Sequence, residues 1–323
     1  MTNYAVVFGS INLDLVVKTP RLPLPGETLT GHGFTTAPGG KGANQAVAIA
    51  RLEVSSYMVG RVGGDNFGRE LLASLQGAGV QTEYVLVDKN ISSGVAAIAV
   101  DDAGENQIIV IPGANGRVDK TDVERLQDVL SEAKVLLLQL EIPLKSVIIA
   151  AQVAKATGVQ VILDPAPAQN LPDELYPLVD IITPNETEAG QLVGFPVNGQ
   201  EAATEAARVL LQKGVGCAIV KLGAKGVVCA TSAETFFTPA FPVMTVDTVA
   251  AGDAFNGGLT AALVEGLPLR QAIVWGAAAG ALAATKPGAQ AAMCDRATLE
   301  TFLATKTINY ASDEMSRCFE KHL

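Results

Sequence analysis

The feature that most constrains the fold is a regular alternation of short β-rich runs with helical patterns in the second half of the chain. Residues 135–140, 159–164, 180–183 and 217–223 read VLLLQL, VQVILD, DIIT and CAIVKLG, and helical patterns such as LKSVIIAAQVAKATG separate them. Strands that alternate with helices in this way build a mostly parallel sheet with helices on both faces. We therefore predict an α/β fold of three layers, α/β/α, in which the opening YAVVFG is a buried strand.

Two stretches depart from this alternation. At about residues 12–37 and 92–112, β-rich runs are broken by turn residues, as in GVAAIAVDDAGENQIIVIPG, a pattern typical of antiparallel pairs. They predict a small antiparallel sheet that projects over the main sheet as a lid, and an extension of a mixed sheet is the alternative. We expect one domain over residues 1–304 and a polar C-terminal tail at residues 305–323.

Charge and composition exclude several function classes. The chain has 33 acidic and 23 basic side chains, and the net charge of −10 weighs against a nucleic-acid surface. Two histidines and four scattered cysteines leave little material for Ser-His-Asp chemistry, a zinc site or a disulfide framework. The apolar runs are too short for a membrane span. We expect a cytoplasmic protein with neither nucleic acid nor membrane as a partner.

The stretch DTVAAGDAF places two carboxylates, Asp247 and Asp253, around small residues. We read VMTVDTV as a strand that ends near Asp247, and GDAFNGGLTAALVEG as a helix, so that the junction falls on Ala250 to Asp253. Free N–H groups at a helix start bind anions, and Asp253 beside them could accept a proton from a hydroxyl. A base next to an anion hole suits phosphoryl transfer by a kinase. The alternative for Asp253 is a plain first-turn carboxylate, and Asp247 is free to bind a cation.

A glycine-rich stretch, APGGKGANQAVAIA, comes before a second helical pattern and carries Lys41 and Asn44 at its start. Gly40 would allow a ligand to approach the backbone closely, and Asn44 offers both a donor and an acceptor to a sugar hydroxyl. A structural glycine turn is the alternative. The stretch matches neither the Walker pattern nor a dinucleotide-binding G-x-G-x-x-G, so neither class is indicated.

Three further motifs carry polar groups. Asn12 and Asp14, in GSINLDL, would lie on one side of an extended chain and suit a polyol, although an Asx turn explains them as well. Asn185 and Glu188, in TPNETEA, could hold the water shell of Mg²⁺ or serve as first-turn dipole partners of a helix. KLGAKG is a strand end and glycine turn at the carboxyl edge of the sheet, where ligands bind in open α/β folds.

Together these motifs resemble the ribokinase family, the phosphofructokinase-B type of carbohydrate kinases, from about Val6 to Leu303. The resemblance rests on the order of GSINLD, GGKGANQA, QLEIPL, DPAPA, DIITPNETEA, KLGAKG, DTVAAGDAF and KPGAQ, which is highly specific. It implies a ribokinase-like fold and the ATP-dependent phosphorylation of D-ribose at O5. Mg²⁺ bound with ATP, an activating K⁺ or other monovalent cation, and a homodimer through the lid sheets are implied with it.

The resemblance also implies a role for individual positions. Asp253 would be the catalytic base, and Ala250, Ala251 and Gly252 the anion hole. Sugar binding is implied for Asn12, Asp14, Gly40, Lys41, Asn44, Glu141 and Asp253. Nucleotide binding is implied for Asn185, Lys221, Leu222, Gly223, Ala224, Lys225, Gly226 and Gly252. The monovalent cation would lie at Asp247, Val249, Ala283, Lys286, Gly288 and Ala292, and Glu188 would act on Mg²⁺ indirectly.

Two rival functions follow from the same motifs. The first is a kinase for another pentose, deoxyribose or a nucleoside, because selectivity among hydroxyls depends on the geometry of the lid. The second, from a different class, is a sugar or nucleotide sensor without turnover. The presence of base, anion-hole and cation residues together favours the enzyme.

Overall fold

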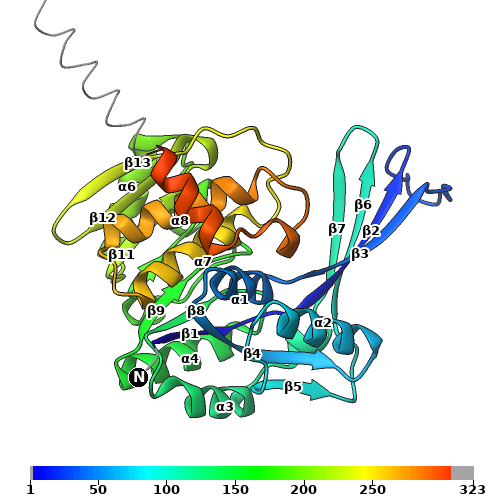
Figure 1. Ribbon diagram of the computed structural model, residues 1–323, viewed down its shortest axis with the longest axis horizontal. Coiled ribbons are helices and arrows are strands. Elements are labelled where there is room, and N and C mark those ends of the chain that lie inside the picture. Colours follow the sequence, from blue (N-terminus) through cyan, green and yellow to red (C-terminus); the bar gives the residue numbers. More distant parts are fainter. Residues whose placement is uncertain (1–2, 307–323) are drawn as a thin grey trace, which may run out of the picture.

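A computed structural model describes residues 3–306 and contains a twisted sheet of 9 strands (Figure 1). In sheet order the strands are β13 (Thr235–Pro239), β12 (Gly226–Thr231), β11 (Cys217–Lys221), β10 (Ile181–Ile182), β9 (Gln160–Leu163), β8 (Val135–Leu138), β1 (Tyr4–Phe8), β4 (Ser55–Gly63) and β5 (Val85–Asp88). Pairing is parallel from β11 to β5, and only the β11–β12 and β12–β13 pairs are antiparallel. The predicted mostly parallel sheet is therefore confirmed.

The strands of this sheet point alternate side chains to opposite faces, and helices cover both faces. Ala5 and Val7 of β1 belong to one hydrophobic core, and Val6 and Phe8 to the other. The first core is closed by α1 (Lys41–Arg51), α2 (Asn66–Gly77), α7 (Ala251–Val264) and α8 (Leu269–Ala283). The second is closed by α3 (Lys120–Leu130), α4 (Leu144–Thr157), α5 (Glu186–Val193) and α6 (Gln200–Gln212). This is the predicted three-layer arrangement.

Local sequence signals mark several helix ends. Asp65 accepts a hydrogen bond from Gly68 N–H at 2.8 Å and caps α2, and Asp119 caps α3 within a capping box. Gly158 ends α4 at φ 75°, a left-handed conformation that glycine adopts without strain. These residues fix where the chain enters α2 and α3 and where it leaves α4.

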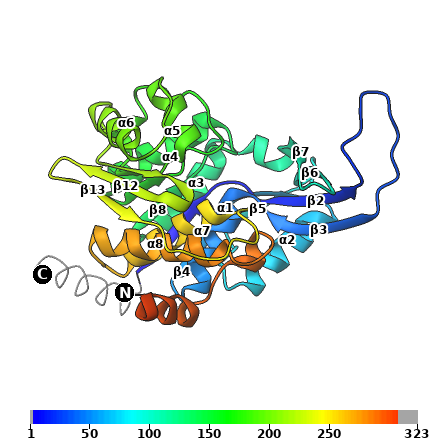
Figure 2. The ribbon, with the colours of Figure 1, turned by 90° about the horizontal axis from the view of Figure 1, so that it is seen from above.

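A second sheet projects from the body as an arm, visible in two views (Figures 1 and 2). Its strands lie in the order β3 (Gly33–Gly39), β2 (Asn12–Thr19), β6 (Gly94–Asp101) and β7 (Asn106–Ile111). The two hairpins are antiparallel as predicted, but the central β2–β6 pair is parallel, so this lid sheet is mixed. It is a separate sheet and not an extension of the main one.

The structure corrects one predicted strand and describes only part of the predicted C-terminal tail. The segment VMTVDTV is a loop, not a strand, and Met244 and Val246 in it are 86% and 60% exposed. Its apolar residues resemble a strand in sequence but pair with no neighbouring strand. At the C-terminus, residues 296–306 are helical, and the rest of the expected tail lies outside the described residues.

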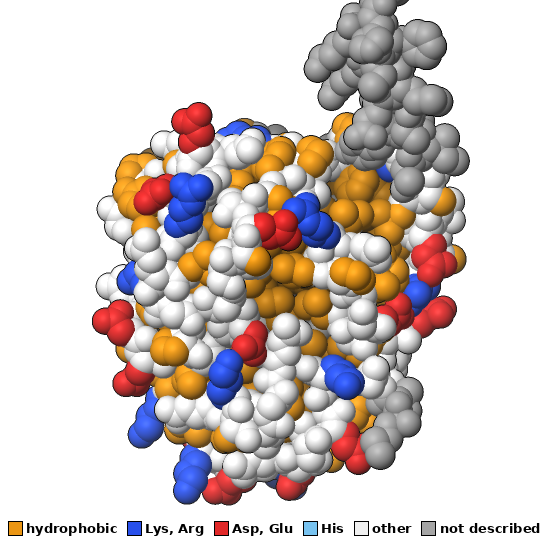
Figure 3. Space-filling model, turned by 90° about the vertical axis from the view of Figure 1, so that its left-hand side faces the viewer, with side chains coloured by type: hydrophobic (Ala, Val, Ile, Leu, Met, Phe, Trp, Pro, Cys, Tyr) orange, Lys and Arg blue, Asp and Glu red, His pale blue; other side chains and the backbone are white. Residues whose placement is uncertain are grey.

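The end of the molecule opposite the lid has a mixed surface. Figure 3 views this end, where β12 and β13 lie, and shows single acidic and basic side chains scattered around hydrophobic and uncharged surface. The helices in the described part of the chain do not combine the length and hydropathy of a membrane span.

Candidate active site

A cavity of about 530 Å³ opens at the carboxyl edge of the main sheet. Its walls come from segments that are distant in sequence: the start of α1, the ends of β9 and β11, the loop 240–250, the first turn of α7 and one side of α8. In an open α/β fold, ligands bind at this edge of the sheet. Residues of both KLGAKG and DTVAAGDAF line this cavity, and KLGAKG lies at the carboxyl edge as expected.

Helices α1 and α7 lie side by side at this edge (Figures 1 and 2). Their close approach depends on Gly257, because a Cβ there would lie only 2.3 Å from Cβ of Ala48. The first turns of both helices therefore point their polar side chains at one place. This packing brings Asn44 within reach of Asp253, 209 residues away in sequence.

Asp253 lies in the first turn of α7 and is 4% exposed. Asn44 Nδ2 donates to its Oδ2 at 2.9 Å, and Gln45 Nε2 donates to its Oδ1 at 3.0 Å. Ala250, just before the helix, adopts φ 57°, and Ala251 N–H donates to the carbonyl of Thr248 at 3.2 Å. First-turn N–H groups such as that of Gly252 have no acceptor within the helix and can bind an anion beside the carboxylate.

Electrostatics around Asp253 are set by burial and by neighbouring charges. Burial raises the pKa of Asp253, Lys41 opposes this and Asp164 adds to it, so that the pKa lies above its ordinary value. Burial alone would lower the pKa of Lys41, but Asp253, Asp164 and other carboxylates outweigh it and raise that pKa. The pair is thus a buried acceptor beside a firmly protonated cation.

Sequence reasoning assigned no role to two side chains that the structure places at the centre of this network, Asp164 and Gln45. Gln45 is fully buried and its Nε2 donates to Asp164 Oδ2 at 2.9 Å as well as to Asp253. Gln139 in turn donates to Gln45 Oε1 at 2.6 Å, and Lys221 Nζ lies 3.1 Å from Asp164 Oδ1. The position of Asp164 directly after β9, in DPAPA, was a usable signal.

The sugar-side candidates gather where the lid joins the body. Asn12 and Asp14 lie two residues apart on β2, with Asn12 facing Gly39 across the hairpin. Glu141 Oε2 accepts hydrogen bonds from Ser10 Oγ at 2.6 Å and from Lys41 N–H at 3.0 Å. Burial, followed by the charges of Glu141 and Asp253, raises the pKa of Asp14 to about 6.

Two glycines make this geometry possible. Gly40 adopts φ 88°, and a Cβ on it would lie 2.7 Å from the backbone nitrogen of Asn12. A Cβ on Gly39 would lie 2.5 Å from Oδ2 of Asp14. The backbone of β3 therefore passes directly against the carboxylate, and larger residues at either position would displace it.

Most nucleotide-side candidates line the cavity. Asn185, Glu188, Lys221, Gly223, Ala224, Gly226 and Gly252 do so. Asn185 and Glu188 form a capping box at the start of α5, in which Glu188 Oε2 accepts from Asn185 N–H at 2.8 Å. Two candidates turn elsewhere: Leu222 is 2% exposed in the core, and Lys225 pairs with Glu186 at the surface. Any contribution of these two to a nucleotide site would come from the backbone.

The two loops expected to hold a monovalent cation are joined by Asp247. Its Oδ1 accepts from Val249 N–H and its Oδ2 from Gly288 N–H, both at 2.9 Å, and Val246 N–H donates to the carbonyl of Ala284 at 2.8 Å. Ala283 and Ala292 are buried and offer carbonyl oxygens but no polar side chain, whereas Lys286 is exposed. Carboxylate and carbonyl oxygens are the ligands that a hard monovalent cation takes, so the residues present fit one.

A parallel sheet with its cavity at the carboxyl edge, a buried carboxylate at a helix N-terminus and a lid sheet beside it define a small-molecule kinase of the α/β class. The model of the family described as pfkB family carbohydrate kinase matches residues 2–296. The chain belongs to this family.

Known relatives are similar over most of their length. A ribokinase from Haemophilus influenzae is 42% identical over 303 residues, which cover 94% of this chain and 99% of that protein. A deoxyribokinase from Salmonella typhi is 40% identical over 252 residues, covering 78% and 82%. The structure of Arabidopsis thaliana ribokinase complexed with ribose and ATP superimposes with a TM-score of 0.87 at 36% identity, covering 94% of this chain and 99% of that one.

Proposed function

We propose that this chain is a ribokinase, which transfers the γ-phosphoryl group of ATP to O5 of D-ribose and gives D-ribose 5-phosphate and ADP. The observation that carries the proposal is Asp253, a buried carboxylate in the first turn of α7 that accepts a hydrogen bond from the sugar-side residue Asn44. The similarity to ribokinases, one of them complexed with ribose and ATP, supports this choice of substrates.

In the proposed reaction Asp253 accepts the proton of the 5-hydroxyl group while O5 attacks the γ-phosphorus. The bond between the γ-phosphorus and the β,γ-bridging oxygen breaks, and ADP leaves. The N–H groups at the start of α7, Gly252 among them, stabilise the charge on the transferring phosphoryl group. Asn44 and Gln45 hold the carboxylate in place through both of its oxygens.

Sugar and nucleotide would meet at Asp253 from opposite sides. Asn12, Asp14, Gly40, Lys41, Asn44 and Glu141 are proposed to bind ribose under the lid. The backbone from Lys221 to Gly226, with Asn185, is proposed to bind ATP in the cavity. Lys221, paired with Asp164, is close enough to the cavity to contact phosphate oxygens.

Two cations belong to the proposal. Mg²⁺ bound with ATP neutralises charge on the β- and γ-phosphates, as it commonly does in kinases. Glu188, which lines the cavity, would orient its water shell. A monovalent cation such as K⁺ would bind at the loops joined by Asp247 and order the start of α7.

We further propose a cytoplasmic location, since the reaction consumes ATP. We also propose that the chain forms a homodimer through its lid sheets. The lid exposes a group of large apolar side chains: Phe34, Ile108, Ile109, Val110 and Ile111. Large exposed apolar side chains of this kind, four of them consecutive on the edge strand β7, are typical of a protein–protein contact. We take residues 1–304 as the kinase domain that carries this lid.

A substrate comparison tests the proposal and its rival. ADP release would be measured with D-ribose, 2-deoxy-D-ribose and adenosine at one Mg-ATP concentration, with and without K⁺. We expect the highest kcat/KM with D-ribose and stimulation by K⁺. The similarity to a deoxyribokinase makes deoxyribose the second candidate, and a higher kcat/KM with 2-deoxy-D-ribose would replace ribose by it.

A further inference from the structure

Asn115 lies in a short 3-10 helix (Gly113–Arg117) that leads the chain from lid strand β7 back into the body. It is 1% exposed and was not among the candidate residues from the sequence. Its side chain reaches back across more than 100 residues to the point where the chain first enters the lid. The residue therefore joins the exit of the lid to its beginning.

Both backbone groups of Ile11 bind this side chain. Ile11 N–H donates to Asn115 Oδ1 at 3.0 Å, and Asn115 Nδ2 donates to the carbonyl of Ile11 at 3.0 Å. A backbone N–H can only donate and a backbone carbonyl can only accept. The orientation of the Asn115 amide is thus fixed by the backbone, not chosen between two equivalent alternatives.

The same Nδ2 also donates to Asn12 Oδ1 at 2.7 Å. Asn12 must therefore turn its carbonyl oxygen toward Asn115 and its Nδ2 away from it. Within residues 3–306, Nδ2 of Asn12 has no hydrogen-bond partner, and it is not sealed from its surroundings. Asn12 is left with an unused donor on the strand that also carries Asp14.

The packing around this amide pair leaves no room for a side chain at residue 94. Gly94 pairs with Asn12 at the start of the β2–β6 ladder. A Cβ on Gly94 would lie 2.2 Å from Asn115 Nδ2 and 2.3 Å from Asn12 Oδ1. The absence of a side chain at this position is what allows the two amides to meet beside the backbone of β6.

We propose that Asn115 is a positioning residue for the sugar: it fixes the amide of Asn12 so that Nδ2 faces the substrate as a donor. Asp14, two residues further along β2, supplies an acceptor when ionised. Neighbouring sugar hydroxyls would then meet one donor and one acceptor, which matches the ability of each hydroxyl to play either part. This inference rests on the proposed binding of ribose at Asn12 and Asp14.

The test is Asn115→Asp, which is nearly isosteric. A carboxylate at residue 115 still accepts from Ile11 N–H, but it has no donor for the carbonyl of Ile11 or for Asn12. Asn12 would therefore turn its Nδ2 toward residue 115 and show oxygen to the sugar. We expect Kd and KM for D-ribose to rise about tenfold, the loss of one hydrogen bond. We expect kcat at saturating D-ribose and KM for ATP to change by less than about threefold, as for uniform binding.

A double-mutant cycle shows whether the effect passes through Asn12. In an Asn12→Ala background, Asn115→Asp should raise KM for D-ribose no further, because the amide that it orients is gone. Ser93→Ala is the matched control: its hydroxyl donates to Asp65 and accepts from Gly63 N–H at the same junction, without contacting Asn12. It should lower the melting temperature and leave KM unchanged.

Two outcomes would overturn the proposal. One is a wild-type Kd for D-ribose in Asn115→Asp, and the other is an equal rise in KM in both backgrounds. If Asn115→Asp does not fold, Asn12→Asp replaces it, because it keeps the bond from Asn115 and puts a charged acceptor where the donor was; a wild-type KM there would contradict the proposal.

Calorimetry measures binding of D-ribose without turnover. It therefore tests the positioning role of Asn115 separately from the proposed kinase function. A wild-type protein that binds D-ribose without releasing ADP would contradict the proposed function and leave the positioning test readable. A wild-type protein that does not bind D-ribose at all would contradict both.

Discussion

At the scale of single residues, the site is organised by amides that hold carboxylates. Gln45 donates to both Asp253 and Asp164 through one Nε2, and Asn44 holds the other oxygen of Asp253. Two buried carboxylates that share a donor remain acceptors, and neither can rotate freely. An amide does this without adding a charge that would compete with Lys41.

This arrangement predicts the effect of Gln45→Leu. Without the shared donor, the ionised form of each carboxylate loses a hydrogen bond, so the pKa of Asp253 rises further. We expect kcat/KM to fall by about 10 to 100-fold and the acidic limb of its pH profile to move to higher pH. Gln76→Leu, a change on the exposed side of α2, is the control. An unshifted pH profile in Gln45→Leu would show that Gln45 only fills space.

We predict that the ionised carboxylate of Asp14 lowers the free energy of unfolding and, at the same time, supports binding of D-ribose. Its pKa is raised from 3.8 to about 6, chiefly by burial. Between these values the folded state holds a proton that the unfolded state has lost, so this residue's contribution to the free energy of unfolding falls as pH rises from about 4 to 6. Above pH 6 the ionised carboxylate is a net cost of about 1 to 3 kcal/mol.

Asp14→Asn should therefore raise the free energy of unfolding by about 1 to 3 kcal/mol at pH 8, with little gain at pH 4. It should at the same time weaken binding of D-ribose. Urea unfolding at the two pH values, beside calorimetry with D-ribose, checks both effects. Equal stabilisation at pH 4 and pH 8 would contradict this assignment of the raised pKa.

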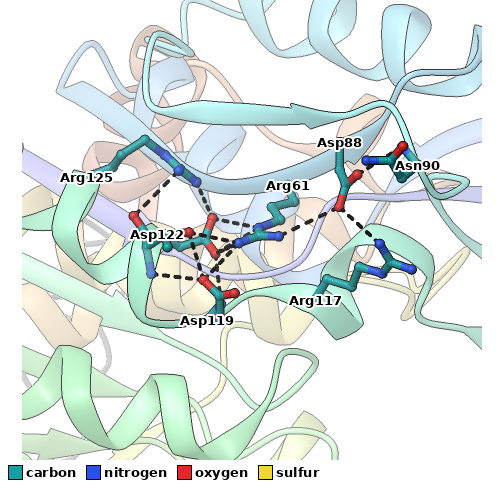
Figure 4. Close-up of polar contacts among 8 residues, drawn as sticks. Arg61, Asp88, Asn90, Arg117, Asp119, Asp122 and Arg125 are labelled. Carbon is teal, nitrogen blue, oxygen red and sulfur yellow. Dashed lines mark hydrogen bonds and ion pairs between the residues drawn. The ribbon is translucent and has the colours of Figure 1, made fainter.

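At the scale of elements, β4 and the start of α3 are fixed to each other by an ionic network (Figure 4). Arg61 on β4, with its side chain 8% exposed, lies 2.6 Å from Asp122, which is fully buried on α3. Asp119 lies 2.9 Å from Arg61, and Asp88 3.7 Å, while Arg125 also contacts Asp122. The network holds the segment that follows Asn115.

Arg61→Met should lower the free energy of unfolding by about 3 to 5 kcal/mol, because it leaves a buried carboxylate with one partner fewer. Asp119→Asn should cost less than about 1 kcal/mol, since that side chain is 58% exposed. Urea denaturation measures both values. KM for D-ribose is expected to stay within about threefold of wild type, and similar losses of stability in the two variants would argue against burial as the cause.

The elements also show how far a sequence can predict such a site. Sequence patterns were sufficient for the main sheet, the hairpins and the start of the helix that carries Asp253. VMTVDTV misled because Val243 lines the cavity and its other apolar residues are exposed instead of packing in a core, a difference that periodicity does not carry. Gln45 and Asn115 were missed because their hydrogen-bond partners lie 208 and 104 residues away in the sequence.

At the scale of the whole molecule, the lid sheet exposes several large apolar side chains to solvent. Ile109 is 67% exposed on the edge strand β7, and its neighbours Ile108 and Val110 are exposed as well. Edge strands of this kind tend to pair with another chain. The proposed homodimer would cover this surface.

Ile109→Lys should therefore give a monomer, because it places a charge in the proposed contact. Light scattering coupled to size exclusion would report the mass. Lys120→Met, a change at an exposed position on α3, is the control for a general effect of altered charge. A wild-type protein that is already monomeric would remove the lid contact from the account.

The most direct test of the whole account is ribose-dependent ADP release by the wild-type protein and by Asp253→Asn, with Mg-ATP and K⁺ at pH 8. The account predicts D-ribose 5-phosphate and ADP in equal amounts from the wild type. It predicts a kcat lower by about 10² to 10⁴ in the variant, with calorimetric binding of D-ribose retained. Near-wild-type turnover in Asp253→Asn would contradict the assignment of the base, and a wild type that releases no ADP with D-ribose would contradict the proposed reaction.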